Sequence, residues 1–368
     1  MLDVQRFDAL GLGPVYEKVL AGERLNLEDG LALFRTEDPH ALGALAHHAR
    51  TKRHGTRVHY VVNRHVNPTN ICVNDCRFCA FRRDEGQAGA YVLTADEALD
   101  KLLASGPVDE VHVVGGCHPT LGLSYYLDLA RRIHQALPHV SVKALTAVEV
   151  DHLARLECLP VADILSRLKR AGVAMLPGGG AEIFAESARR DLCPSKISGA
   201  RWLEIMGIAH GLGVPSNATM LFGHVETLED RLEHLDLLRR QQDASGGFVC
   251  FIPLPYLPGN NPLGSTAHGP SPMDVLRTMA VSRLMLDNIP HIKAYWVMLG
   301  VKLAQLCLSY GADDLDGTVV EEKIGHDAGS DAAQALSITQ LEEAIRDAGF
   351  LPVRRDALFR DRVEIRRG

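Results

Sequence analysis

The sequence of 368 residues contains no apolar run long enough to cross a membrane. Its first residues, Met1 to Asp8, lack the basic segment followed by an apolar segment that marks a secretory signal. We therefore expect no membrane partner and no secretion. A cytoplasmic location is the expectation that follows.

Positive charge is not in excess either. The 39 Lys and Arg residues face 46 Asp and Glu residues, which gives a net charge of -7. Because proteins that bind nucleic acid carry basic surfaces, this balance argues against a nucleic-acid partner. The hydrophobic fraction of 46% is ordinary for a globular protein, and the length suffices for one large domain or two ordinary ones.

A disulfide framework is also missing. Five of the eight cysteines are scattered singly, unlike the cysteines of small secreted domains. We interpret these five as small apolar core residues: Cys117, Cys158, Cys193, Cys250 and Cys307.

The other three cysteines, Cys72, Cys76 and Cys79, lie within eight residues with the spacing C-x3-C-x2-C. Thiolates so close together favour a soft metal centre, and an iron–sulfur cluster is the first candidate. A four-iron cluster would leave one iron without a protein ligand here. The alternative is a non-catalytic zinc site, which usually has four protein ligands, and no fourth partner is evident.

From Arg57 onward, short apolar runs alternate with longer amphipathic segments, which indicates parallel βαβ units. The predicted strands are Val58–Val66, Glu110–Val114, Val140–Leu145, Gly172–Leu176, Pro215–Leu221, Gly247–Ile252, Ile292–Val297 and a weaker one at Ala312–Leu315. Eight repeats predict an α/β fold of the (β/α)8 TIM-type barrel class. An open doubly wound sheet has the same alternation and stays a competitor.

Three parts are expected along the chain: an N-terminal helical extension over residues 1–55, the barrel over 56–316, and a C-terminal extension over 317–368 that packs on the barrel. Asn26 is the expected cap of a first-part helix, Leu27–Phe34. The last part holds a helix at Ile338–Ala348 and a short segment at Val353–Ile365.

Active residues of such barrels lie on loops at the carboxyl ends of the strands. The cysteine loop follows the first predicted strand. Glycine-rich or polar stretches that include Gly115, Glu149, Glu182 and His224 follow later strands. The pattern predicts one site that collects them at a single rim.

The cysteine spacing resembles that of the radical S-adenosylmethionine (SAM) enzymes. The stretch Asn67–Phe81 is similar to the subgroup that makes menaquinone by the futalosine route and the deazaflavin of coenzyme F420. Four further stretches resemble the aminofutalosine synthases: Gly178–Phe184, Ser216–His224, His291–Trp296 and Gly311–Glu322. The resemblance runs from the N-terminal helices to about Gly329.

This resemblance implies that the three cysteines ligate a 4Fe–4S cluster whose fourth iron binds SAM. One electron would cleave the sulfonium to methionine and a 5′-deoxyadenosyl radical. In the aminofutalosine synthases that radical adds to the enol ether of 3-[(1-carboxyvinyl)oxy]benzoate. Rearrangement and loss of the carboxylate then give 6-amino-6-deoxyfutalosine. SAM is thus a consumed co-substrate, and an electron donor such as flavodoxin or ferredoxin is expected.

The resemblance also implies contacts to the cofactor. Phe78 and backbone atoms of Ala80 are expected beside the adenine, and the backbone of Gly115 and Gly116 beside the methionine amino group. A simple tight turn is the alternative for the glycines. Glu182 is expected at the ammonium or the ribose, although a surface carboxylate at a helix start would look the same. Glu149 is a second candidate for the ribose.

Other candidates face the substrate. His118 and His224 could bind its carboxylates or act as general acid–base groups, but 17 histidines make a structural role common. The remaining candidates share a capacity for hydrogen bonding or charge pairing: Arg190, Lys196, Asn217 and Thr219, with Asp313, Asp314 and Asp316 as orienting groups.

Two alternatives remain open at this point. One is another radical SAM enzyme of the subgroup, either the cyclase that acts later in the futalosine route or the deazaflavin-forming enzyme. The other is the zinc-binding protein.

Overall fold

The computed structural model describes residues 2–104 and 106–362. Its central strands are short and pair in parallel. They are β1 (Arg57–Val61), β2 (Asn63–Val66), β3 (Glu110–Val113), β4 (Ser141–Ala144), β5 (Val173–Met175), β6 (Ser216–Phe222), β7 (Phe248–Pro255), β8 (His291–Ile292) and β9 (Asp314–Gly317). β1 and β2 are separated only by Val62 and share one strand position.

The strands form a closed ring. Three ladders run β2-β3-β4-β5, β6-β7-β8 and β10-β1-β9. Single bridges join them, from Leu176 to Ser216 and from Lys293 to Asp314. The ring has eight strand positions, so the predicted TIM-type barrel is confirmed and an open sheet, which would leave two unpaired edges, is not formed.

The predicted strand Val58–Val66 changes partner in its middle. The carbonyl of Val62 accepts hydrogen bonds from the N–H groups of Asp109 (2.7 Å) and Glu110 (3.2 Å). Before this point β1 pairs with β10 (Leu351–Arg355), and after it β2 pairs with β3. A strand from the end of the described chain therefore enters the barrel wall beside β1.

The predicted strand Ile292–Val297 is wrong beyond its first residue. Strand β8 ends at Ile292, and Trp296 begins helix α13 (Trp296–Leu299). The Trp296 side chain is fully buried, and its indole N–H donates to the carbonyl of Gly317 (2.8 Å). Tertiary packing thus overrides the strand preference of this apolar, aromatic stretch.

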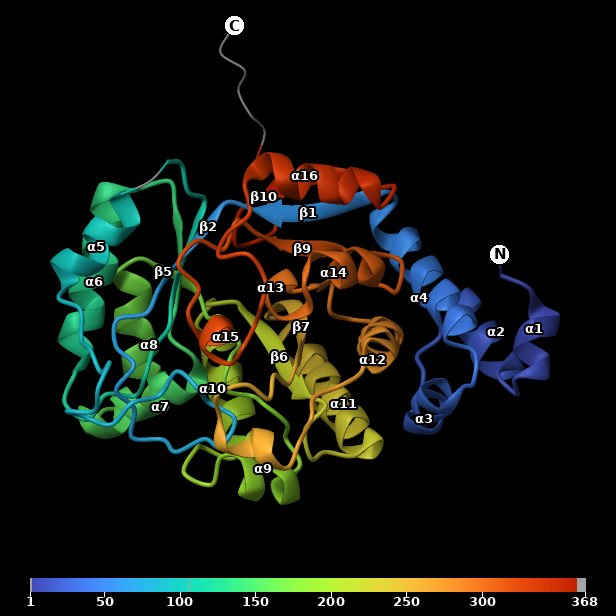
Figure 1. Cartoon of the computed structure of the whole chain (residues 1–368), viewed down its shortest axis with the longest axis horizontal. Helices are drawn as coiled ribbons and strands as arrows, with labels where there is room; N and C mark the ends of the chain where they lie inside the picture. The colour runs from blue at the N-terminus through green and yellow to red at the C-terminus, as the bar shows by residue number, and fades with distance from the viewer. Residues whose placement is uncertain (1, 105, 363–368) are drawn as a thin grey trace, which may run out of the picture.

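Four helices precede the barrel: α1 (Val4–Ala9), α2 (Gly13–Ala21), α3 (Leu27–Arg35) and α4 (Pro39–His54). Asn26 caps α3 as predicted, because its side chain accepts from the N–H of Asp29. The four lie on one flank of the molecule, where α4 leads into β1 (Figure 1).

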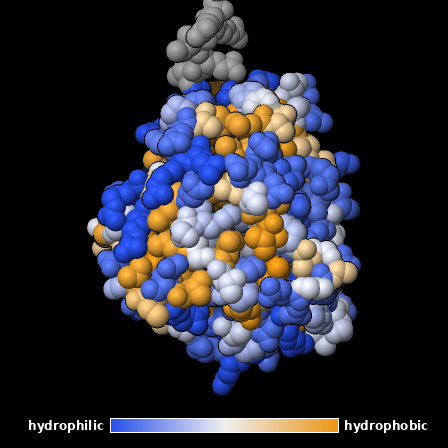
Figure 2. Space-filling view, turned by 90° about the vertical axis from the view of Figure 1, so that its left-hand side faces the viewer, coloured by the Kyte–Doolittle hydropathy of each residue, from blue (hydrophilic) through white to orange (hydrophobic). Residues whose placement is uncertain are grey.

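Further helices surround the ring: α5 (Ala95–Leu103), α6 (Leu123–Ala136), α7 (Ala147–Leu156), α8 (Val161–Arg170), α9 (Glu186–Leu192), α10 (Gly199–Gly211), α11 (Leu228–Ser245), α12 (Pro272–Met285), α14 (Val301–Leu308), α15 (Ile324–Asp327) and α16 (Ile338–Asp347), with the 3-10 helix η1 (Pro262–Ser265). On the face left of Figure 1, which includes α5 and α6, hydrophilic side chains are interspersed with apolar ones (Figure 2). This mixture is typical of helices that turn one apolar stripe toward a core. Within the described ranges, no helix is both long and apolar enough for a membrane span.

The C-terminal strand closes one gap in the wall. β10 runs parallel to β1 over its whole length, and Arg354 pairs with Asp109, just before β3 (2.7 Å). The predicted segment Val353–Ile365 overlaps β10, and its residues 363–365 lie outside the described residues.

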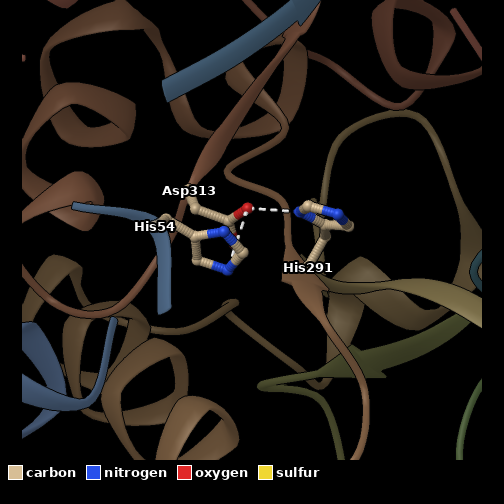
Figure 3. Close-up of side chains that lie close together, drawn as sticks. All are labelled: His54, His291 and Asp313. Atoms are coloured by element: carbon tan, nitrogen blue, oxygen red, sulfur yellow. Dashed lines mark hydrogen bonds and ion pairs between the residues drawn. The ribbon is translucent and has the colours of Figure 1, made fainter. Parts of the chain in front are cut away.

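The amino-terminal ends of the strands carry a buried polar cluster (Figure 3). One oxygen of Asp313 lies 2.6 Å from Nδ1 of His291 and 3.5 Å from Nε2 of His54. Its other oxygen accepts from the guanidinium of Arg283 and from the N–H of Ile292. Burial alone would raise the pKa of Asp313, but Arg283 and the histidines hold it well below its usual range. The cluster is a paired network that ties α4, α12, β8 and β9 together.

Candidate active site

A cavity of about 320 Å³ opens among the carboxyl ends of the strands, where a barrel enzyme has its active site. Its wall includes all three residues of the cysteine motif, Cys72, Cys76 and Cys79. Gly115, Glu149 and Glu182 line the same cavity, as predicted, whereas His224 does not.

The cysteine loop is held in place by backbone hydrogen bonds to other loops. The N–H of Val73 donates to Cys117 (3.0 Å), after β3, and the N–H of Arg77 donates to Leu192 (2.8 Å), at the end of α9. Inside the loop, the N–H of Cys79 donates to the carbonyl of Cys76 (3.1 Å). These bonds fix the backbone of the loop and so position its thiols along the cavity wall.

The three sulfur atoms of the cysteine loop do not all lie within 4.8 Å of one another. Among the described residues, the only such group of three or more His, Cys, Asp or Glu ligand atoms is His54, His291 and Asp313. The loop offers three thiols, whereas structural zinc sites have four protein ligands and cysteine thiolates are the usual ligands of iron–sulfur clusters.

The thiols differ in their surroundings. The thiol and the backbone N–H of Cys117 hydrogen-bond to Cys72 and lower its pKa to about 5, with the N–H 3.3 Å from Sγ. Burial raises the pKa of Cys76 to about 12 and that of Cys79 above its usual value. Binding to iron removes the proton from such thiols outright, so three cysteines on one loop fit a cluster. Cys117 is buried, as predicted, but it also holds the first thiol. Cys158 is exposed, so the prediction of a core residue there is wrong.

Gly115 and Gly116 let two loops touch. A Cβ on Gly115 would lie 2.8 Å from the carbonyl oxygen of Thr69, and a Cβ on Gly116 only 2.2 Å from that of Ile71. The two glycines are thus required where the loop after β3 packs on the cysteine loop. Both also line the cavity, so their backbone is available to a ligand.

Glu149 is the buried support of this glycine loop. Its Oε1 accepts from the N–H of Gly115 (3.0 Å), and its Oε2 accepts from the N–H (2.7 Å) and hydroxyl (2.8 Å) of Thr146. Burial raises the pKa of Glu149 to about 7, although these hydrogen bonds oppose the shift. Because Thr146 and Glu149 also form the capping box of α7, one carboxylate fixes a helix start and a cavity loop.

A buried ion pair faces the cysteines. Lys196 Nζ lies 2.5 Å from Oε1 of Glu182 and 5.2 Å from the centre of the Phe78 ring. Burial disfavours its charge, but Cys76 and Glu182 raise the pKa of Lys196 well above its usual value. Glu182 has a φ of 50°, in the left-handed region, which is uncommon for a residue other than glycine. Lys196 is therefore a cation at the cysteine loop that is paired with one carboxylate.

Strand β6 contributes Asn217 and Thr219. The Thr219 hydroxyl donates to the carbonyl of Gly178 (2.9 Å), whereas Oδ1 of Asn217 is buried without a hydrogen-bond partner in the described structure. Both residues line the cavity, as do Phe78 and Ala80.

Three predicted site residues lie elsewhere. Nδ1 of His118 accepts from the N–H groups of Thr120 and Leu121 (both 3.1 Å), so its ring closes a turn. The ring of His224 is fully buried, and its Nε2 donates to the carbonyl of Leu221 (2.9 Å). Arg190 is exposed on α9. The structure gives none of them access to the cavity, so the predicted catalytic and substrate-binding roles are not supported.

Sequence reasoning missed the polar residues deeper in the barrel, with the exception of Asp316. The cavity is also lined by inward-facing residues of the strands and of the segments after them: His65, Glu110, His112, Lys143, Lys293, Tyr295, Asp316 and Glu322. Polar residues at every second position of β2, β3 and β4 were the available signal.

Sequence comparison places the chain among known enzymes. The Radical SAM superfamily matches residues 66–238, and the CofH/MqnC C-terminal region matches residues 245–366. The chain is 46% identical over 361 residues to aminodeoxyfutalosine synthase of Thermus thermophilus, covering 95% of this chain and 97% of that protein. The identity to aminodeoxyfutalosine synthase of Streptomyces coelicolor is 42%, with 93% and 92% covered.

A relative with another activity is also similar. It is 5-amino-6-(D-ribitylamino)uracil--L-tyrosine 4-hydroxyphenyl transferase of Methanopyrus kandleri, 39% identical with 96% of this chain and 97% of that protein covered.

Solved structures agree on the fold. The FeFe-hydrogenase maturase HydG of Carboxydothermus hydrogenoformans superposes with a TM-score of 0.76 at 19% identity, covering 97% of this chain and 83% of that one. Methylornithine synthase (PylB) superposes with a TM-score of 0.74 at 19% identity, covering 92% and 97%. The chain belongs to the radical SAM superfamily and, within it, to the family of the aminodeoxyfutalosine synthases.

Proposed function

We propose that this enzyme joins the adenosyl group of SAM to 3-[(1-carboxyvinyl)oxy]benzoate and releases the vinyl carboxylate, which gives 6-amino-6-deoxyfutalosine. The observation that carries the proposal is the 46% identity to an aminodeoxyfutalosine synthase over almost the full length of both chains. The cavity supports it, because cysteine ligands, close-packed glycines and buried cations line one enclosed space.

The residues of the cavity fit the cofactors of the family. A 4Fe–4S cluster held by Cys72, Cys76 and Cys79 supplies the electron that cleaves the SAM sulfonium. The chain's own residues then position the adenosyl and methionine groups. In our proposal the backbone of Gly115 and Gly116, held by Glu149, receives the methionine amino group.

Other contacts follow from the same geometry. Phe78 and the backbone of Ala80 border the adenine in our proposal, and the Glu182 carboxylate, already paired with Lys196, accepts from the ribose hydroxyls. Asn217, whose Oδ1 is unpartnered, and Thr219 lie on the opposite wall beside the substrate. We assign the ion pair to cofactor binding, and we propose no role for His118, His224 or Arg190 in the reaction.

The reaction needs one electron from outside the protein. We propose a small carrier such as flavodoxin or ferredoxin as the donor. The free cysteines and an oxygen-sensitive cluster suit a reducing compartment, which is why we propose the cytoplasm as the location.

Anaerobic turnover tests the function. Reconstituted, reduced protein with SAM and 3-[(1-carboxyvinyl)oxy]benzoate should form 6-amino-6-deoxyfutalosine, detected by mass spectrometry. The same protein with tyrosine and 5-amino-6-(D-ribitylamino)uracil serves as the comparison, since a relative is named for that transfer. Product only in the second reaction, or a colourless protein without about four irons per chain, would refute the proposal.

A further inference from the structure

The deep part of the cavity, below the cysteine loop, is built from charged and imidazole side chains. His65, His112 and Lys143 are in register on β2, β3 and β4, so they form one inward-facing row. Lys293, after β8, also lines the cavity. We call His65, His112, Lys143 and Lys293 the cavity floor.

Two ammonium groups of the floor have donors to spare. Lys143 Nζ donates to Glu110 (2.9 Å) and Lys293 Nζ donates to Asp316 (2.6 Å), and these are their only hydrogen bonds within the described residues. Each ammonium has three N–H donors. Both lysines are almost fully buried, with 3% and 2% of their surface exposed. A group bound in the cavity can therefore supply further acceptors.

The two histidines are incomplete as well. Nε2 of His65 and Nε2 of His112 are buried and have no hydrogen-bond partner in the described structure. Their rings lie 4.5 Å apart, so one group could contact both. Buried polar atoms without partners are rare because each costs about 1–3 kcal/mol, and such atoms in a cavity mark where a polar ligand group binds.

The substrate of the proposed function offers such a group. It has a carboxylate on the vinyl group that reacts and a second one on the benzoate ring. Because the vinyl carbon must meet the adenosyl group near the cysteine loop, the ring carboxylate at the other end of the molecule points to the deeper cavity. A carboxylate accepts several hydrogen bonds, and those from ammonium groups are the stronger kind.

We propose that the cavity floor binds the benzoate carboxylate of the substrate, through Lys143 and Lys293 and through the Nε2–H groups of His65 and His112. This inference rests on the proposed function, and it assigns residues that make the enzyme specific for a substrate with an anionic ring.

The charges of the floor set a condition on this binding. Lys143, Lys293 and Arg355 are balanced by Glu110, Asp314 and Asp316, whose carboxylates they contact. An additional carboxylate is therefore not neutralised by surplus cations. Burial holds the pKa of His65 and of His112 below its usual value, so both imidazoles would bind the carboxylate as neutral N–H donors, and the lysines carry the positive charge of the floor.

The test compares two substrates in wild type and one paired variant. The variant Lys143→Met/Glu110→Gln removes an ammonium together with its partner, so neither charge is left alone. Its KM for 3-[(1-carboxyvinyl)oxy]benzoate should rise roughly 10- to 100-fold, the loss of one or two charge-assisted hydrogen bonds. Its KM for 2-phenoxyacrylate, which lacks the ring carboxylate, should match that of wild type. An equal rise for both substrates, or no rise for the first, overturns the proposal.

Two controls separate folding from recognition. Lys18→Met/Asp29→Asn removes a partly buried pair outside the barrel and should change neither KM. If Lys143→Met/Glu110→Gln does not fold, Lys293→Met/Asp316→Asn replaces it, because Asp316 has a positive φ of 65° that asparagine tolerates.

A binding measurement distinguishes failure of this inference from failure of the proposed function. Calorimetry with 3-methoxybenzoate and with methoxybenzene needs no turnover. If wild type prefers the anionic probe and the paired variant loses that preference, the floor is an anion site even if no 6-amino-6-deoxyfutalosine is formed. If turnover occurs but the preference is absent or survives in the variant, the inference fails and the function stands.

Discussion

Both ends of the barrel contain buried charged side chains and histidines, but these groups have all their hydrogen-bond partners at only one end. At the amino-terminal end, the Asp313 carboxylate is surrounded by Arg283, His54 and His291, and both of its oxygens have partners. At the carboxyl-terminal end, the two histidines and two lysines of the cavity floor retain unpartnered nitrogens or spare N–H donors. The hydrogen bonds at the amino-terminal end are all made within the protein. Those at the carboxyl-terminal end are completed only when a ligand binds.

This difference separates stability from function. When a buried charge is fully paired, removing one partner leaves the other charge uncompensated and destabilises the fold. Buried groups that lack partners reduce stability and persist where a ligand completes them. Changes at the amino-terminal end should therefore affect unfolding, and changes at the cavity should affect binding and turnover.

The largest expected effect is loss of reaction on changing a cluster ligand. Cys76→Ser should abolish SAM cleavage, measured as methionine release, because one iron loses its thiolate. The free energy of unfolding of the metal-free protein should change by less than about 1 kcal/mol, since one sulfur is exchanged for oxygen. A variant that is unstable but still cleaves SAM would contradict the claim that changes at the cavity affect the reaction and not the stability.

Next in size is the amino-terminal network. Arg283→Met removes the guanidinium partner of the buried Asp313 carboxylate and should lower the free energy of unfolding by about 3–5 kcal/mol in urea titrations. The double variant Arg283→Met/Asp313→Leu should recover a large part of this loss, because no charge stays buried. Full stability of the single variant, or a KM change in its folded fraction, would contradict a purely structural role.

The same network predicts a pH dependence. Because the pKa of Asp313 in the folded protein is far below its unfolded value of about 3.9, its contribution is present above pH 4 and is lost as the pH falls further. The difference in unfolding free energy between wild type and Asp313→Asn should thus be greatest near pH 7 and shrink below pH 4. A difference that stays constant down to pH 2 would argue that the charge is not involved.

A smaller effect is expected at Glu149, which both caps a helix and holds a loop of the cavity. Glu149→Gln keeps one oxygen for Thr146 and weakens the hold on Gly115, so the affinity for SAM should fall about 10-fold in equilibrium dialysis. The matched control is Glu97→Gln, which alters the same kind of capping box at α5, with Thr94 as the cap. Both variants weaken a capping box, and only the first should lose SAM affinity. If the Glu149→Gln and Glu97→Gln variants bound SAM with equal affinity, the glycine loop would not be part of the cofactor site.

The smallest effect is predicted for two residues that sequence alone made candidates. His118→Ala and His224→Ala should change kcat/KM by less than about 3-fold in the fraction that stays folded, because neither ring reaches the cavity. Turnover measured beside thermal unfolding checks this. A large drop in kcat without loss of stability in either variant would return that histidine to the reaction.

The sequence predicted those site residues that belong to short motifs or lie in or directly after a predicted strand. The cysteine motif and the glycines after β3 follow predicted strands, Asn217 lies within one, and the barrel topology brings such positions together. His118 and His224 follow strands too. Their rings instead satisfy nearby backbone groups, which depends on turn conformation that the residue types do not specify.

The cavity floor escaped prediction for a different reason. His65, His112 and Lys143 occupy strands that were expected to be apolar because parallel strands are buried on both faces. Their adjacency depends on strand register, and register joins residues about 30 to 50 positions apart. The pairing of β10 with β1 could not be predicted either, since it joins residues about 290 positions apart.

The fate of the adenosyl carbon tests the central claim most directly. With SAM carrying ¹³C at the 5′ position, each methionine released should be matched by one molecule of 6-amino-6-deoxyfutalosine that contains the label. The label should be absent from 5′-deoxyadenosine above the level seen without substrate. Label recovered mainly in 5′-deoxyadenosine, with hydrogen taken from the substrate, would show hydrogen abstraction and contradict radical addition in this cavity.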